Sequence, residues 1–239
     1  MRPWLWCVPV VDARRAEFLN RLHVHADDVL VIDNTATPGI PTSRFPRRVG
    51  TGLNHGCARS WNLGAKAAIA DRRPGVIFPS PSVVLGEPGG LDVVDVIEDQ
   101  ADEWGAFFAG LGWHMHAWRV DAFDRVGFFD ERIYPVYFED DDWLRRVRLA
   151  GGGDRRGAGA VPEISIDATM GASGQSIEHL QRDLDLGHLG AYYREKWGGL
   201  PDSETYETPY NLDVGLGWWP GHSYAGTPGM APTPPPVGP

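Results

Sequence analysis

Hydrophobic positions in this chain form two kinds of pattern that alternate along its first two thirds. Uninterrupted apolar runs, typical of strands buried on both faces of a parallel sheet, occur at 4–11, 29–33 and 76–78. Apolar residues recur at helical spacing at 13–23 and 54–72. The same criteria then predict a helix at 91–99, strands at 104–108 and 113–118, a helix at 120–126, a strand at 164–166 and a helix at 177–197. This alternation indicates βαβ units, whose ligand sites lie at the carboxyl ends of the strands.

The periodic pattern ends near residue 200. We therefore expect one α/β domain at 1–200 and an irregular, proline-rich C-terminal extension at 201–239, which ends in GMAPTPPPVGP. Within it, the pair Trp218-Trp219 is compatible with a packed flap, a subunit interface or a lid over a ligand.

Composition and charge narrow the class of protein. The chain has 239 residues, of which 42% are hydrophobic and 23% charged, as in soluble globular proteins. A net charge of −10 argues against nucleic-acid partners. The two cysteines, Cys7 and Cys57, are interpreted as reduced, buried small hydrophobes, which indicates a cytoplasmic compartment. Because no apolar run approaches the roughly 20 residues that span a bilayer, we expect no transmembrane segment. The oligomeric state stays open.

The richest chemistry lies in the segment 127–151, GFFDERIYPVYFEDDDWLRRVRLAG. Its second half has helical spacing of apolar residues and begins with the four acids 139–142. One acid suits a helix N-terminus, but four adjacent carboxylates repel one another. The residues alone leave two hypotheses: a capped structural helix, or a catalytic carboxylate whose pKa is raised by the aromatic residues that precede it.

Four segments in order resemble the family 2 nucleotide-sugar glycosyltransferases of GT-A fold, in particular the rhamnosyl and galactofuranosyl transferase branch. They are VIDNTATPG from Val31, NHGCARSWNLG from Asn54, the segment 127–151 and YYREKWG from Tyr192. The resemblance covers residues 4–199. It implies a Rossmann-like, mostly parallel sheet flanked by helices.

The resemblance also implies a donor site. The end of the first strand, with Pro9 and Val11, and the end of the second, with Asp33 and Asn34, would hold the nucleotide base. Asp33 would accept a hydrogen bond from the base, although an aspartate here also suits a turn cap. Arg59 and Asn62 would lie beside the phosphates, where a guanidinium can bind a diphosphate through two hydrogen bonds. A solvated helix face is the alternative for Arg59.

On the acceptor side, the resemblance implies that Asp140 is the general base of an inverting transfer. Glu139 and Asp142 complete the predicted catalytic group, and Asp130 with Glu131 would shape the acceptor pocket. Trp113 and His114 are further acceptor-binding candidates, because an indole can stack on a sugar ring. His114 and His116 are also spaced for a metal site or for hydrogen bonding in a cleft.

The metal site departs from the family pattern. Relatives place an acid just after the third strand to bind Mg²⁺ or Mn²⁺, but here Ser82 stands at that position and Ser80 where an asparagine is usual. A serine hydroxyl is a poor ligand for a hard cation. Three explanations compete: basic side chains replace the metal, another acid such as Glu87 or Asp167 binds it, or the chemistry is lost. We expect weak or absent metal dependence with catalysis retained.

The sequence thus favours a hexosyl- or deoxyhexosyltransferase that uses a UDP-, dTDP- or GDP-linked donor. Its acceptor would be a glycan, a lipid-linked glycan, a protein or a small molecule. A catalytically silent module of similar fold that binds a carbohydrate or a partner is the main alternative. A nucleotidyltransferase is disfavoured, because residues 9–15 form no glycine-rich basic loop.

Overall fold

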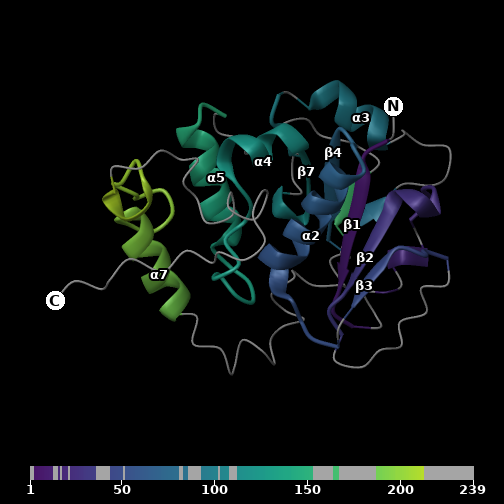
Figure 1. Ribbon diagram of the computed structural model, residues 1–239, viewed down its shortest axis with the longest axis horizontal. Helices are drawn as coiled ribbons and strands as arrows, with labels where there is room; N and C mark the ends of the chain where they lie inside the picture. Colours follow the sequence, from purple (N-terminus) through teal and green to yellow (C-terminus); the bar gives the residue numbers. More distant parts are fainter. Residues whose placement is uncertain are drawn as a thin grey trace.

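The centre of the protein is a six-stranded mixed sheet (Figure 1). In the computed structural model, the residues described are 3–12, 16, 18–20, 22–35, 44–50, 52–80, 83–85, 93–101, 103–107, 112–152, 164–166 and 187–212. In spatial order the strands are β3 (Arg48–Gly50), β2 (Val29–Asp33), β1 (Leu5–Val10), β4 (Gly75–Pro79), β7 (Met115–Arg119) and β6 (Gly105–Phe107). β7 runs antiparallel to both of its neighbours, and the pairs from β3 to β4 are parallel. The prediction of an α/β fold with a mostly parallel sheet is confirmed.

Both faces of the sheet are buried, which is why its central strands are continuous apolar runs. Along β1, alternate side chains enter different cores: Trp6 and Val8 face one, and Leu5 and Cys7 face the other. The first core is closed by apolar residues between 16 and 22 and by α3 (Val93–Gln100). The second is closed by α2 (Gly56–Ala70), α4 (Val120–Val126) and α5 (Glu139–Leu149).

The C-terminal part of the described chain lies at the end of the molecule opposite β2 and β3 (Figure 1). It contains α7 (Gly187–Trp197) and the 3₁₀ helix η5 (Pro209–Asn211). Just after residue 200, the backbone N–H groups of Thr205 and Tyr206 donate hydrogen bonds to the carbonyl of Trp197 at the end of α7. Residues 213–239, which include the Trp218-Trp219 pair, lie outside the described residues.

The elements follow the predicted pattern with specific exceptions. The strand at 113–118 is shorter than predicted, because residues Gly112–His114 form a 3₁₀ helix, η2, and β7 begins at Met115. His114 and His116 therefore do not share one strand face. Short elements that the sequence pattern missed are β3, the 3₁₀ helix η1 (Ala26–Asp28) and β5 (Val83–Leu85), which pairs with β8 (Ile164–Ile166).

Three of the predicted helices, at 13–23, 91–99 and 177–197, fall partly outside the described residues. The second is described from Val93 onward and the third from Gly187 onward. Within the described part of the chain, none of the helices has the length and apolar character that crossing a bilayer requires.

Candidate functional site

The strand ends that were predicted to hold a ligand meet at one edge of the sheet. Strands β1, β2 and β4 are parallel and end there at Val10, Asp33 and Pro79. The antiparallel strand β7 begins at the same edge, with Met115 opposite Pro79. β1 is paired with β2 on one side and β4 on the other, so the chain reverses its direction of winding here, and such a switch point leaves a crevice for ligands.

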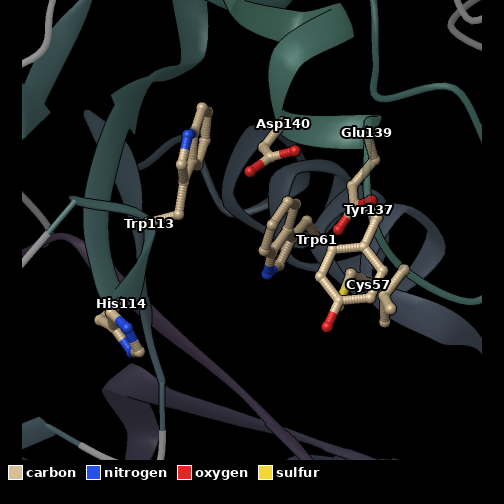
Figure 2. A pocket seen from close by; sticks show the side chains of 8 residues that line it. Cys57, Trp61, Trp113, His114, Tyr137, Glu139 and Asp140 are labelled. Carbon is tan, nitrogen blue, oxygen red and sulfur yellow. The ribbon is translucent and has the colours of Figure 1, made fainter. Parts of the chain in front are cut away.

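A pocket of about 120 Å³ opens among α2, η2 and the start of α5 (Figure 2). Its lining residues are Cys57, Trp61, Trp113, His114, Val136, Tyr137, Glu139 and Asp140. Three segments that are far apart in the sequence therefore meet in one place. Four of the predicted site residues, Glu139, Asp140, Trp113 and His114, are brought together here.

Indole rings form one wall of the pocket. The ring centroids of Trp61 and Trp113 are 6.1 Å apart with an interplanar angle of 17°, so the two rings lie nearly parallel. The ring of His116 packs at a steep angle against both indoles, with its centroid 4.9 Å from that of Trp61 and 4.7 Å from that of Trp113. Burial lowers the pKa of His116 to about 3, and its Nδ1 accepts a hydrogen bond from Trp118. His116 is therefore uncharged. It packs against the two indoles that line the pocket but does not line the pocket itself.

Two adjacent carboxyl groups from the first turn of α5 lie near Trp61, on the side of the pocket away from Trp113 (Figure 2). The side chain of Asp140 is half-buried and is turned toward Trp61 and Trp113. Glu139 is only 4% exposed and extends toward Cys57 and Tyr137. Burial raises the pKa of Glu139 well above its usual range, and the charges of Asp140 and Asp141 raise it further. A hydrogen bond with Cys57 lowers this pKa in part, but the net effect is that Glu139 is harder to ionise than a carboxyl group in water.

Backbone strain marks the entry into α5. Tyr137 and Phe138 adopt φ values of 75° and 73°, which place two consecutive non-glycine residues in the left-handed region. Each such residue costs about 1–3 kcal/mol, and strain of this kind clusters at functional sites. The Phe138 ring packs on Tyr193 of α7, with centroids 5.4 Å apart. The strained turn is thus held from outside the pocket while Tyr137 lines it.

A close backbone approach fixes α2 against the segment that leads to α5. The N–H of Cys57 donates to the carbonyl of Pro135 over 2.9 Å. Gly56 has a φ of 74°, and a Cβ there would lie 2.8 Å from the same carbonyl oxygen. Only glycine fits both the conformation and the space. This contact sets the Cys57 side chain beside Glu139.

Asp142 was predicted to be catalytic, but the structure places it away from the pocket. Its Oδ2 accepts hydrogen bonds from Arg146, at 2.9 and 3.1 Å, and its Oδ1 accepts from the Trp197 indole at 2.9 Å and from Lys196. Asp142, Arg146 and Lys196 are all fully buried. This arrangement ties α5 to α7.

Asp130, predicted to bind the acceptor, belongs to the same buried network. It accepts hydrogen bonds from Tyr192 at 2.6 Å, from Lys196 at 3.2 Å and from Arg132 at 2.9 Å. Burial opposes its ionisation, but the charges of Lys196 and Arg132 and the hydrogen bonds outweigh burial and hold its pKa below the usual range. Asp130 does not line the pocket. Glu131 is exposed and accepts a hydrogen bond from Asn62.

At the donor side, Asp33 is a buried acceptor at the end of β2. Its Oδ1 accepts from the backbone N–H of Thr35 at 2.9 Å, and its Oδ2 pairs with Arg48. Burial raises the pKa of Asp33, but the bonds from Thr35 and Arg48 outweigh burial and hold the pKa below its usual value. The turn-capping role proposed for Asp33 is therefore present, and Arg48 is a partner that the sequence did not indicate.

The two asparagines predicted to bind the donor connect structural elements. Asn34 donates to Ser60 and accepts from the N–H of His55, which links β2 to the start of α2. Asn62 donates to the carbonyl of Phe129 at 2.9 Å and accepts from its N–H at 2.8 Å, which anchors the segment before α5 on α2. Their hydrogen bonds hold the walls of the site.

The other residues predicted to bind the donor are Pro9, Val11, Arg59, Ser80 and Ser82. Pro9 and Val11 are partly buried at the sheet edge, and Arg59 is exposed on α2. The N–H of Ser80 donates to the carbonyl of His114 at 2.6 Å, so it connects β4 to η2. Ser82, Glu87 and Asp167 lie outside the described residues. Among the residues that are described, no group of three or more His, Cys, Asp or Glu side chains is arranged to hold a metal ion.

Four pocket residues were not predicted as site residues: Cys57, Trp61, Val136 and Tyr137. Cys57 was interpreted as a buried hydrophobe and Trp61 as a core residue of its helix. Cys57 is half-buried and lines the pocket, whereas Cys7 is fully buried, and both are free thiols. The available signal was the position of Cys57 and Trp61 on one face of the helix that begins in the NHGCARSW segment.

The sequence matches no protein-family model and none of the curated proteins with which it was compared.

Proposed function

We propose that this protein is a glycosyltransferase of GT-A type that moves a sugar from a nucleotide-diphosphate donor to an acceptor hydroxyl with inversion. The observation that carries the proposal is Asp140, a half-buried carboxylate in the first turn of α5 that faces a tryptophan-walled pocket. The pocket adjoins α2, which Asn34 ties to the strand end that holds Asp33. The candidate general base, Asp140, and the candidate nucleotide-binding residue, Asp33, are thus positioned by elements that contact one another.

The proposed reaction assigns one step to each group. Asp140 accepts the proton of the acceptor hydroxyl, and the resulting oxygen nucleophile attacks the anomeric carbon of the donor. A new C–O bond forms on the opposite face as the bond to the nucleoside diphosphate breaks, and the diphosphate leaves with the electron pair. The proton remains on Asp140 until it passes to solvent.

Charge on the leaving diphosphate needs compensation. Arg59 is exposed on the first turns of α2, where the helix N-terminus also favours negative charge. We therefore assign the diphosphate to Arg59 and α2. Because Ser82 stands where relatives place a metal-binding acid, the proposal includes little or no dependence on Mg²⁺ or Mn²⁺.

Calorimetric titration with UDP-, dTDP- and GDP-sugars, followed by an assay of sugar release, tests the proposal. We expect Asp33→Asn to weaken donor binding, and Asp140→Asn to leave binding intact while abolishing turnover. Asp202→Asn is the matched control, because this carboxylate is 60% exposed and far along the chain from the site. Turnover should persist in EDTA.

Two results would decide against an enzyme. If no nucleotide sugar binds and none is hydrolysed, the glycosyltransferase proposal fails. If a nucleotide sugar binds but wild-type protein and Asp140→Asn are equally inactive with every acceptor, the protein is a silent binding module.

A further inference from the structure

One polar atom in the pocket has no use in the reaction described above. Among the described residues, Oε2 of Glu139 has no hydrogen-bond partner, although the side chain is 96% buried. Leaving a buried polar atom unpaired costs about 1–3 kcal/mol. Glu139 is one of the residues that line the pocket, beside Trp61 (Figure 2), so its unpaired carboxyl oxygen lies at the pocket wall.

The groups around Glu139 decide which kind of hydrogen bond it can make. Its own helix contributes the negative charges of Asp140 and Asp141, which add to burial in raising the pKa of Glu139. The thiol of Cys57 on α2 forms a hydrogen bond with the carboxyl group that lowers this pKa without reversing the shift, and Tyr137 lies in the preceding turn. Across the pocket stands His114, whose pKa is lowered by burial. None of the eight described lining residues is lysine or arginine. A second negative charge beside Asp140 has no counter-charge among these residues, which favours the protonated form of Glu139, and a protonated carboxyl group can donate a hydrogen bond.

The pocket therefore combines three recognition elements. The indoles of Trp61 and Trp113 present apolar faces, Asp140 accepts hydrogen bonds, and neutral Glu139 can both donate and accept. Its volume of about 120 Å³ is somewhat below that of an engineered cavity that holds benzene, about 150 Å³, so it has room for one part of a sugar ring, with the rest of the ring outside the pocket. The same elements disfavour anions, because Asp140 would repel them.

We infer that Glu139 is an uncharged hydrogen-bond donor that selects a neutral, polyhydroxylated ring stacked on Trp61 and Trp113 as the acceptor. This inference rests on the proposed function in treating the pocket as the acceptor side. It divides the two adjacent carboxyl groups between two tasks. Asp140 takes the proton of the reacting hydroxyl, and Glu139 binds a neighbouring oxygen of the same ring.

Cys57 provides a reporter for the charge on Glu139. Alkylation by iodoacetamide proceeds through the thiolate, so a neighbouring negative charge slows it by raising the thiol pKa. Cys7 is fully buried, and burial raises the pKa of its thiol far above the usual value, which makes it an internal unreactive control. The rate at Cys57, measured by mass spectrometry, then reads the local charge.

The expected rates separate the two carboxyl groups. At neutral pH Glu139→Gln should change the Cys57 rate by less than about twofold, because it replaces one neutral group by another, whereas Asp140→Asn should raise it roughly 3- to 10-fold. If Glu139→Gln accelerates alkylation as much as Asp140→Asn does, Glu139 is ionised and the inference is wrong.

Ligand selection is tested with free glucose, galactose, mannose and rhamnose against glucuronate and galacturonate. A bound ring should protect Cys57 from alkylation and quench tryptophan fluorescence. We expect neutral sugars to protect and the uronates not to. Glu139→Gln should bind like wild type, because an amide also donates and accepts, whereas Glu139→Ala should bind about 5- to 10-fold more weakly. Binding by wild type, but not by Glu139→Gln, should weaken as Glu139 ionises at high pH.

Two kinds of result would contradict the inference. Protection by uronates equal to that by neutral sugars, or unchanged binding by Glu139→Ala, removes Glu139 as the selecting group. Failure of every neutral sugar to protect wild-type Cys57 removes the ligand class. These results are separate from donor binding: nucleotide sugars may bind while the inference fails, or neutral sugars may bind as inferred while no donor does, and then the glycosyltransferase proposal alone falls.

Discussion

Replacing Asp142 with asparagine removes one of four charges that are buried between α5 and α7. Asp142 and Asp130 balance Arg146 and Lys196 in this cluster, and each of the four is at most 4% exposed. The asparagine keeps the shape but leaves two buried cations with one buried carboxylate. Breaking a buried ion pair on one side costs about 3–5 kcal/mol. For a chain of this length, that corresponds to a fall in melting temperature of roughly 6–20 °C.

The loss of stability in Asp142→Asn depends on whether Lys196 is protonated. Burial lowers the pKa of Lys196 to about 8, although Asp142 and Asp130 both raise it. Without Asp142 that pKa falls further, so the variant can relieve part of its excess charge by releasing the proton. Below pH 8, Lys196 is therefore protonated in a smaller fraction of folded variant molecules than of folded wild-type molecules. The deficit should therefore shrink as pH rises toward about 8 and stay constant above it.

Urea unfolding followed by circular dichroism measures the loss, with Asp202→Asn as the matched control. Asp202 pairs with Arg148 at 3.5 Å on the surface and is 60% exposed, so its loss should cost less than about 1 kcal/mol. A free-energy change for Asp142→Asn that equals the control would refute the structural role assigned here. The Cys57 alkylation rate should stay at the wild-type value in the folded variant, because Asp142 does not line the pocket.

Three further predictions concern the pocket itself. Tyr137→Gly should be more stable than Tyr137→Ala by about 1 kcal/mol in urea unfolding, because a φ of 75° strains alanine but not glycine; equal stabilities would contradict the strain. Gly56→Ala should lower the free energy of unfolding by more than about 1 kcal/mol and expose Cys57 to faster alkylation, since its Cβ meets Pro135; an unchanged rate would show that this contact does not shape the pocket. Glu139→Gln should be more stable than wild type at neutral pH and equally stable below the ordinary carboxyl pKa of about 4.3. Because the pKa of Glu139 is raised in the folded protein, wild type loses stability as pH rises above that value, and the glutamine variant does not. A gain in stability at all pH values would exclude ionisation of Glu139 as its cause.

The fold could be predicted wherever strands are buried on both faces. β1, β2 and β4 are continuous apolar runs, because both cores need apolar side chains from them. β3 has three residues, of which two are exposed, so it leaves no apolar run to detect. The start of β7 was misplaced because Trp113 and His114 are as compatible with a strand as the residues that follow them.

The site was predictable where residue type points to chemistry, and less so where geometry decides. Asp140 and Asp142 are of the same type, but two residues correspond to a rotation of about 200° around a helix, so they cannot face the same pocket. The spacing of Asp142 and Arg146 already favoured an ion pair on the other side of α5. Trp61 had the pattern of a core residue, and only the position of η2 shows that its ring also forms a wall.

The reversed direction of β7 has a consequence for how recognition could diversify. Because this strand begins at the edge where its neighbours end, the residues just before it, including Trp113 and His114, are delivered to the pocket by a connection rather than by the sheet. The pairing of Met115 with Pro79 fixes the strand without constraining the length of chain that precedes η2. Insertions or replacements ahead of Gly112 would therefore alter which ligands fit while the scaffold and the carboxyl pair on α5 remain in place.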